Sequence, residues 1–257
     1  MIDTAAHRDW LLATAAAFRD ETATVRTIVF DVPAWTGHRA GQHVDIRLTA
    51  GDGYQAERSY SIASPAGTGT QIELTVERIS NGEVSPFLTE ELVPGDTIEL
   101  RGPIGGYFAW DPKSPSPLML IAGGSGVVPL VSMLRTRCKR GIEIPARLLY
   151  SSRTVEDIIY RQELDRLVAY RDGFSLVHTI TRGAPAGWKS ETRRVDRDML
   201  AAHAFPAVQK PEIFVCGPSS FVETVADQLI ALGHGESAIK TERFGPTGES
   251  GRAREQA

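Results

Sequence analysis

Residues 118–129 read LMLIAGGSGVVP, an apolar run followed by a glycine turn and a helix start. Five consecutive apolar residues, 118–122, are typical of a strand that is buried on both faces of a parallel sheet. Glycines let a backbone approach a ligand closely, and the free N–H groups at the start of a helix attract anions. Pro129 fits the first turn of a helix, where its missing N–H costs little. The stretch therefore predicts a strand–turn–helix unit that can hold a phosphate group.

The same turn departs from several better-known motifs. Gly124, Gly126 and Pro129 follow the spacing G-x-G-x-x-P, so the last small residue of the dinucleotide fingerprint is absent. No P-loop lysine follows the turn, and Val127 stands where a nucleophile elbow needs its second glycine. These residues alone leave a purely structural corner open as the alternative.

Strand and helix signals alternate after this unit. Apolar runs at 147–150, 174–181, 213–216 and 238–242 predict strands, and 130–139, 156–170 and 221–232 predict helices. This order is typical of a doubly wound α/β parallel sheet over residues 118–245. A second turn, Cys216, Gly217 and Pro218, also follows a strand, so both turns are expected to face one ligand crevice.

The first 111 residues have a different pattern of residue types. Short stretches rich in β-branched residues are separated by Gly and Pro turns, which predicts an antiparallel β-barrel with strands at 24–32, 43–48, 60–63, 71–79 and 97–101 and one short helix at 85–92. Residues 10–18, WLLATAAAF, fit either an N-terminal helix or a first strand. We expect residues 112–117, PKSPSP, to form a linker and residues 246–257 a flexible tail.

Composition narrows the class of protein. The chain has 257 residues, with 28 Lys and Arg against 32 Asp and Glu, and this acidic balance argues against a nucleic-acid partner. Two cysteines, Cys138 and Cys216, cannot supply a four-cysteine iron–sulfur cluster or zinc site. The leading segment contains acidic residues, unlike a signal peptide, and no apolar run is long enough for a membrane span. We therefore expect a cytoplasmic protein without a metal.

Five short motifs occur in a characteristic order. They are Arg58, Tyr60 and Ser61 on a barrel strand; Gly82 and Ser85; the turn at 123–129; Cys216, Gly217 and Pro218; and Glu242, Arg243 and Phe244. In this order they resemble the ferredoxin–NADP(+) reductase superfamily, particularly the reductase components of bacterial oxygenases, over residues 10–245. The resemblance implies a flavin-binding barrel followed by an NAD(P)-binding α/β domain.

The resemblance implies an FAD site on the barrel. Arg58 would bind the flavin pyrophosphate, Tyr60 would stack on the isoalloxazine ring, and Ser61 would form a hydrogen bond near flavin N5. Other residues expected around FAD are Ser59, Val76, Arg78, Gly82, Ser85 and Phe244. FAD is favoured over FMN because the segment 82–85 suits a pyrophosphate. Without the resemblance, Arg58 could equally be a surface ion-pair residue and Tyr60 a half-buried strand residue.

The resemblance also implies a nicotinamide nucleotide site. Gly124, Ser125 and Gly126 would hold the nucleotide, Cys216, Gly217 and Pro218 would lie by its nicotinamide ring, and Glu242 would be a polar partner near the transfer site. Ser61, Cys216 and Glu242 are the catalytic candidates. Ser151, Arg153, Thr181 and Arg182 favour NADPH, whereas Glu156 and Asp157 would repel its 2′-phosphate, so NADH stays possible.

The expected activity is hydride transfer from NAD(P)H to FAD N5, followed by transfer of single electrons to a separate acceptor protein. This chain lacks the cysteines of a fused [2Fe–2S] domain, so the acceptor is expected to be separate. The candidate acceptors are a ferredoxin, an oxygenase and a molybdoenzyme. Two alternatives remain: a flavin- and nucleotide-binding regulatory module without turnover, and a reductase of free flavin or quinone. None of the six histidines shows the spacing of a metal site, and no hydrolase triad can be assigned.

Overall fold

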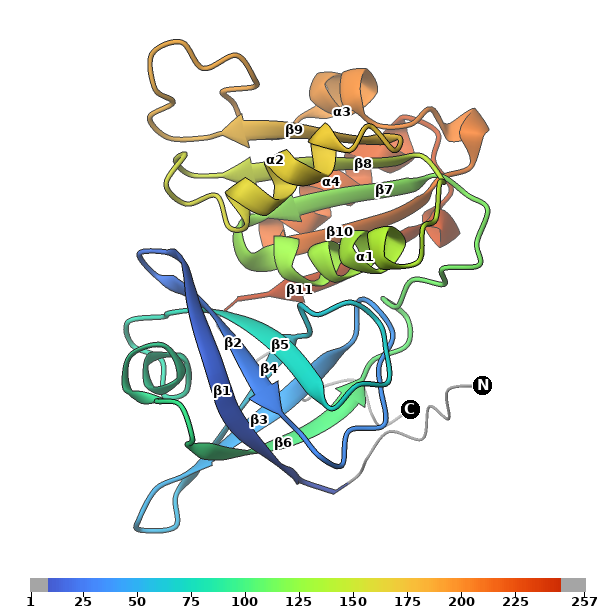
Figure 1. Ribbon diagram of the computed structural model, residues 1–257. Helices are drawn as coiled ribbons and strands as arrows, with labels where there is room; N and C mark the ends of the chain where they lie inside the picture. Colours follow the sequence, from blue (N-terminus) through green and yellow to red (C-terminus); the bar gives the residue numbers. More distant parts are fainter. Residues whose placement is uncertain (1–8, 246–257) are drawn as a thin grey trace, which may run out of the picture.

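The computed structural model describes residues 9–245, which form two sheets (Figure 1). The first is a six-stranded antiparallel sheet of order β4-β3-β6-β1-β2-β5. The second is a five-stranded parallel sheet of order β11-β10-β7-β8-β9. The predicted fold class, an antiparallel barrel followed by a parallel α/β sheet, is confirmed. Within residues 9–245, no helix is both long and apolar enough to cross a bilayer.

The barrel closes around a core of alternating buried side chains. Its strands are β1 (Leu11–Thr22), β2 (Val25–Asp31), β3 (His43–Thr49), β4 (Gln55–Ser61), β5 (Gln71–Glu77) and β6 (Thr97–Ile104). A bridge from Ile62, directly after β4, to Leu74 in the middle of β5 joins the two outer strands of the sheet. Residues 10–18, which fitted a helix or a strand, lie mostly in β1 between β2 and β6. The predicted short helix at 85–92 is the π-helix η1 (Phe87–Glu91).

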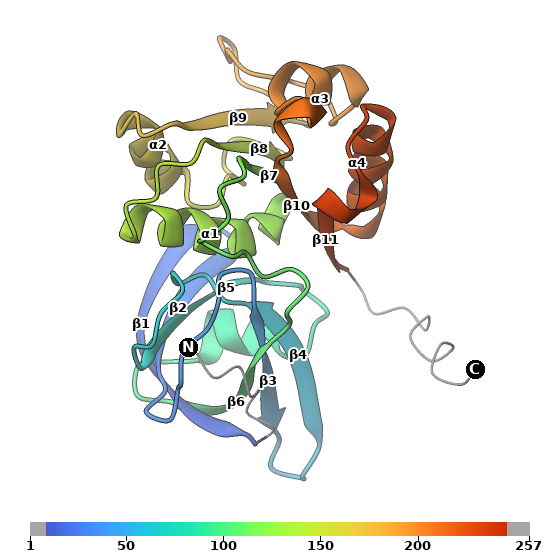
Figure 2. The ribbon, with the colours of Figure 1, turned by 90° about the vertical axis from the view of Figure 1, so that its right-hand side faces the viewer.

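The second sheet has helices on both faces (Figure 2). Its elements are β7 (Leu118–Gly123), η2 (Gly124–Gly126), α1 (Val127–Lys139), β8 (Ala146–Ser152), α2 (Arg161–Ala169), β9 (Phe174–Ile180), α3 (Arg197–His203), η3 (Ala207–Gln209), β10 (Glu212–Pro218), α4 (Ser219–Ala231), η4 (Glu236–Ala238) and β11 (Ile239–Phe244). The sequence did not predict α3, although Asp196 caps it by accepting a hydrogen bond from the N–H of Met199 at 2.8 Å. Helix α2 begins later than predicted, since Tyr160 has a positive φ of 60° that interrupts the helix.

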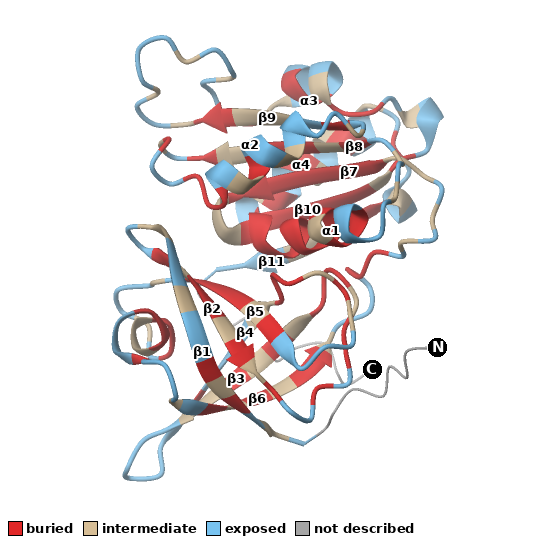
Figure 3. Cartoon of the chain, viewed as in Figure 1, coloured by how far each residue is buried: buried red, intermediate tan, exposed pale blue. Residues whose placement is uncertain are grey.

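Strand β7 is buried along its length (Figure 3). Leu118 and Leu120 pack in the core that includes α1 and α2, and Met119 and Ile121 pack in the core that includes α3 and α4. Successive side chains of a strand point to opposite faces, so one apolar run supplies both cores. This explains why the run at 118–122 has no polar residue.

Helix α1 lies between the parallel sheet and the barrel in both views (Figures 1 and 2). The Ser132 hydroxyl donates to the carbonyl of Ser64 at 2.7 Å, and the Thr136 hydroxyl accepts from the N–H of Ala66 at 2.8 Å. All these groups are buried, and buried hydrogen bonds are costly to break. They fasten α1 to the chain that directly follows strand β4.

Arg135 strengthens the same contact between α1 and the barrel, which is called the α1 joint below. Its guanidinium donates to both carboxylate oxygens of Glu163 on α2 at 2.7 Å. It also donates to the Ala63 carbonyl at 2.8 Å and to Glu73 of β5 at 3.0 Å. The guanidinium lies over the ring of Tyr160, 5.0 Å from the centroid. One side chain, only 13% exposed, therefore joins two helices and the barrel.

We expect Arg135→Met to destabilise the protein by about 3 kcal/mol, because it leaves the partly buried Glu163 without its partner and Glu73 with Arg19 alone. The free energy of unfolding in urea measures this loss. Arg140→Met, at the exposed end of the same helix, should change it by less than about 0.5 kcal/mol. Equal effects of the two variants would show that the joint does not depend on Arg135.

Candidate functional site

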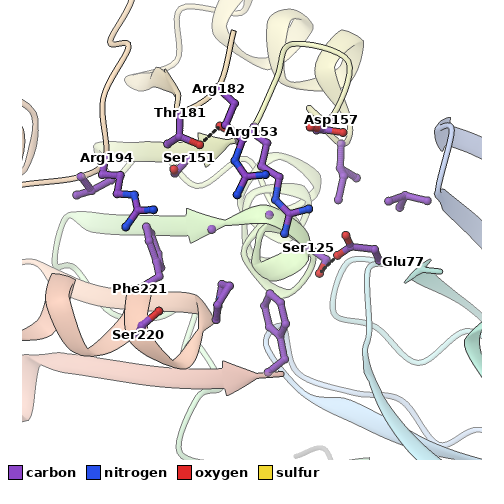
Figure 4. A pocket seen from close by; sticks show the side chains of 18 of the residues that line it. Glu77, Ser125, Ser151, Arg153, Asp157, Thr181, Arg182, Arg194, Ser220 and Phe221 are labelled. Atoms are coloured by element: carbon purple, nitrogen blue, oxygen red, sulfur yellow. Dashed lines mark hydrogen bonds between the residues drawn. The ribbon is translucent and has the colours of Figure 1, made fainter. Parts of the chain in front are cut away.

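A pocket of about 650 Å³ opens where the parallel strands end. The barrel also contributes to its wall, so the pocket lies between the two sheets (Figure 4). A pocket of this size can hold a nucleotide. Its lining from the parallel domain includes Gly123, Gly124, Ser125, Ser151, Ser152, Arg153, Asp157, Thr181, Arg182, Arg194, Pro218, Ser220, Phe221 and Phe244, and the barrel adds Thr22, Thr24, Val25 and Glu77.

The two predicted turns pack directly on each other. A Cβ added at Gly126 would lie 2.2 Å from the carbonyl oxygen of Cys216, and one at Gly217 would lie 2.8 Å from the Phe221 ring. Gly126 and Gly217 are therefore required by packing, and neither lines the pocket. Gly124, with a φ of 56°, and Ser125 do line it. The turn thus combines a packing role with an open face toward a ligand.

Three arginines reach the pocket from separate segments. Figure 4 shows the guanidinium groups of Arg153, Arg182 and Arg194 directed into it. The N–H of Arg182 donates to the carbonyl of Arg153 at 2.7 Å, which holds the ends of β8 and β9 together. Sequence reasoning selected Arg153 and Arg182 but missed Arg194, which precedes α3 and belongs to no motif. Three cationic groups facing one pocket are suited to phosphate oxygens.

Other polar groups of the pocket have defined partners. Asp157 accepts hydrogen bonds from the N–H and the hydroxyl of Thr154, both at 3.1 Å. The Ser125 hydroxyl donates to Glu77 at 2.7 Å. By contrast, Ser152 is only 4% exposed, and its hydroxyl has no hydrogen-bond partner within residues 9–245. Ser152, which the sequence analysis did not select, is therefore a buried polar residue in the pocket wall.

Arg58 lies on the barrel in an exposed ion pair. Its guanidinium donates to Glu83 at 3.0 Å and to the Glu57 carbonyl at 2.7 Å, and the Tyr54 hydroxyl donates to the other oxygen of Glu83 at 2.6 Å. Both members of the pair are 47% exposed. An exposed pair contributes little to stability, so an anionic ligand could replace the carboxylate at low cost. The geometry of Arg58 matches the alternative of a surface ion pair. Its guanidinium is still accessible to a ligand.

The candidate residues near Arg58 differ in how accessible their side chains are to a ligand. Tyr60 is half-buried against the barrel core, and burial raises the pKa of its phenol. Ser59 points elsewhere, because its hydroxyl donates to Asp45 at 2.7 Å. Val76 is fully buried in the core, so it offers only its backbone to a ligand. Tyr60 is thus the aromatic surface available on this strand, and Ser61 follows it at the strand end.

The segment that follows β5 forms a tight turn. The Ser85 hydroxyl, which is buried, accepts a hydrogen bond from the N–H of Ile79 at 3.0 Å. A Cβ on Gly82 would lie 3.0 Å from that hydroxyl oxygen and 3.1 Å from the Ile79 carbonyl. Arg78 donates a hydrogen bond to Glu90. The N–H of Gly82 donates to the Ile79 carbonyl at 2.8 Å, so Ser85 and Gly82 both shape the turn.

Two of the catalytic candidates, Cys216 and Glu242, contact each other, and His43 lies beside Glu242. The Cys216 sulfur lies 3.8 Å from one carboxylate oxygen of Glu242, and Nδ1 of His43 lies 3.9 Å from the other. His43 pairs with Ser61 in the β3–β4 register. The sequence analysis did not select His43, because its approach to Glu242 joins two separate domains.

Burial sets the protonation of this cluster. Burial raises the pKa of Glu242 to about 7, and burial together with Glu242 raises the pKa of the Cys216 thiol. Burial also lowers the pKa of His43. Near neutral pH, Cys216 is therefore a neutral thiol rather than a nucleophilic thiolate, whereas Glu242 can hold or release a proton.

Comparison with known proteins gives matches over both halves. A family model described as an oxidoreductase FAD-binding domain matches residues 18–109, and one described as an oxidoreductase NAD-binding domain matches residues 120–227. Ferredoxin–NADP reductase B of Sorangium cellulosum is 35% identical over 207 residues, which cover 78% of this chain and 80% of that protein. The FAD/NAD-binding domain of nitric oxide dioxygenase from Vibrio cholerae has the same fold, with a TM-score of 0.82, 24% identity, and coverage of 93% of this chain and 100% of that one.

Two relatives are named as parts of oxygenase systems. The glycine betaine monooxygenase reductase subunit of Pseudomonas aeruginosa is 33% identical over 231 residues, covering 88% of this chain, and the chain spans only 62% of that relative. The ferredoxin reductase component of 3-ketosteroid-9-alpha-monooxygenase from Rhodococcus rhodochrous is 31% identical over 242 residues, which cover 91% of this chain and 65% of that protein. The identity and coverage with the Sorangium reductase, together with the matches to both domain models, show that the chain belongs to the ferredoxin–NADP(+) reductase family of FAD- and NAD(P)-binding oxidoreductases.

Proposed function

We propose that this protein transfers hydride from NADPH to bound FAD and then passes single electrons to a separate acceptor protein. The observation that carries this proposal is the pocket that three arginines and the glycine turn line on one side and the barrel lines on the other. Residues 1–111 would form the flavin-binding domain and residues 118–245 the nucleotide-binding domain, joined by residues 112–117. The predicted flexible tail, residues 246–257, lies outside the described residues.

The barrel fits FAD through groups that are accessible. Arg58 is exposed and would bind the pyrophosphate in place of Glu83, helped by backbone N–H groups near Gly82 and Ser85. Tyr60 would stack on the isoalloxazine ring, and Phe244, 36% exposed at the end of β11, would cover its other face. FAD when bound supplies an acceptor for hydride and a donor of single electrons. The segment 82–85, which suits a pyrophosphate, is what favours FAD over FMN.

The catalytic cluster would act on the ring edges. Ser61 would donate a hydrogen bond to the flavin near N5, and the neutral thiol of Cys216 would contact the nicotinamide without charge. Glu242, with a pKa near 7, would hold or release a proton at its carboxylate. Cys216 is 1% exposed, so its thiol is shielded from solvent. These groups orient the reactants and exclude solvent rather than form covalent bonds with them.

The arginines of the pocket support NADPH as the nucleotide. Arg153, Arg182 and Arg194 would surround the 2′-phosphate, with Ser151 and Thr181 beside them, whereas Asp157 is the nearby acid and is already held by Thr154. The three arginines therefore outnumber the two acids of the pocket lining, Asp157 and Glu77. The names of the two monooxygenase relatives support an oxygenase or ferredoxin as the acceptor. A molybdoenzyme acceptor and a cytoplasmic location remain predictions, as does the absence of a metal.

Arg182→Ala and Arg194→Ala should each raise the KM for NADPH by about tenfold to a hundredfold, since each removes a charged hydrogen bond to phosphate. The KM for NADH should change less than about threefold. Steady-state rates with an artificial electron acceptor provide both values. Arg166→Ala, exposed on α2 outside the pocket, is the matched control. Equal effects on both nucleotides would disprove the 2′-phosphate assignment.

Glu242 gives the protein a specific dependence of stability on pH. Because its folded pKa is raised from 4.5 to about 7, its stabilisation is complete below 4.5 and is lost as the pH rises through 7. Relative to Glu242→Gln, the wild type should lose about 2 kcal/mol between about pH 5 and about pH 8. Urea unfolding across this range measures the difference. Glu223→Gln, exposed on α4, should show no such trend, and a parallel pH dependence of wild type and Glu242→Gln would contradict the raised pKa.

A further inference from the structure

We propose that Glu77 weakens the binding of the nicotinamide nucleotide and speeds its release. Its carboxylate would do so by holding the Ser125 hydroxyl and by placing a negative charge beside the phosphate-binding turn. The proposal rests on the proposed function, because it requires that the pocket holds an NAD(P) nucleotide. The effect on nucleotide binding is thereby assigned to a residue of the barrel, whereas the sequence motifs of the nucleotide site all lie in the other domain.

The contact bridges the two sheets at the pocket wall. Ser125 lies in η2 (Gly124–Gly126), and Glu77 is the last residue of β5 in the barrel. The Ser125 hydroxyl donates to the Glu77 carboxylate at 2.7 Å, as the dashed line in Figure 4 shows. Both residues line the 650 Å³ pocket. A ligand that takes a hydrogen bond from this hydroxyl must first displace Glu77.

The charge of Glu77 is not compensated as its neighbours' charges are. Arg78 pairs with Glu90, and Glu73 on the same strand pairs with Arg135. Within residues 9–245, the side-chain partner of Glu77 is a neutral hydroxyl. An unpaired carboxylate in a pocket lined by three arginines subtracts from the positive potential that attracts phosphates.

A purely structural role for this contact is a weak alternative. The Ser125–Glu77 bond is exposed, and exposed polar contacts contribute little to stability. The domains are already fastened by the buried bonds of Ser132 and Thr136. The position of Glu77 therefore matters more for what enters the pocket than for how the domains are held.

A reductase that accepts hydride repeatedly must release oxidised nucleotide before the next cycle. Three arginines favour retention of a phosphate-bearing product, and affinity differences of this kind act mainly on the dissociation rate. A nearby carboxylate shortens the residence time because it repels the bound phosphates and reclaims the Ser125 hydroxyl. Glu77 would thus balance the arginines that give the site its selectivity.

The test is the dissociation constant of NADP+ for the FAD-loaded protein, measured by calorimetry, with its dissociation rate from stopped-flow displacement. Glu77→Gln keeps an acceptor for Ser125 and removes the charge. We expect its dissociation constant to fall by about fivefold, mostly through slower dissociation, and the difference to shrink at high salt. Asp52→Asn, in the exposed β3–β4 hairpin, makes the same charge change away from the pocket and should leave binding unchanged.

The outcomes separate the two proposals. If the wild type binds NADP+ and Glu77→Gln binds it equally or more weakly, the role of Glu77 is wrong and the proposed function stands. If Asp52→Asn tightens binding as much as Glu77→Gln does, the effect is one of net charge and the assignment to Glu77 is also wrong. If neither wild type nor variant binds NADP+ or NAD+, the proposed function and this inference fall together.

Discussion

The fastening of helix α1 to the barrel is the constraint on which the rest of the structure depends. Hydride transfer requires two rings in contact, so a flavin domain and a nucleotide domain must hold a fixed relative position. Helix α1 begins at the glycine turn and carries Ser132, Arg135 and Thr136 on its barrel side. Their backbone partners lie at residues 63–66, shortly after Ser61 on β4. One helix therefore ties the turn that would hold the nucleotide to the strand that would hold the flavin.

The contacts nearer the reacting groups are looser than this joint. His43 approaches Glu242 only to 3.9 Å, and the Ser125–Glu77 bond is exposed. Phe244 ends β11 with 36% of its surface exposed. Buried bonds at α1 with weaker contacts around the pocket would let ligands enter while the two domains keep their relative position. Under the proposed function, each weak contact would adjust binding or proton transfer without a large cost in stability.

Much of the fold could be predicted because its signals are local. The run at 118–122 must be apolar because its side chains pack into two cores, and this pattern can be recognised within one stretch of sequence. Residues 10–18 could not be assigned, because an alanine-rich apolar run fits a helix or a strand until its neighbours in the sheet are known. The late start of α2 depends on the left-handed conformation of Tyr160, which no propensity indicates. His43 and Arg194 reach the site only through tertiary folding, so no spacing could select them.

Single-turnover reduction of the FAD-loaded protein by NADPH, followed anaerobically by rapid mixing, tests most directly whether the two domains present a flavin and a nicotinamide to each other. The account predicts that the flavin absorbance falls in a first-order process, at a rate that saturates with NADPH because the nucleotide binds before it reacts. Flavin that stays oxidised, or a rate that rises linearly with NADPH as for flavin free in solution, would contradict it.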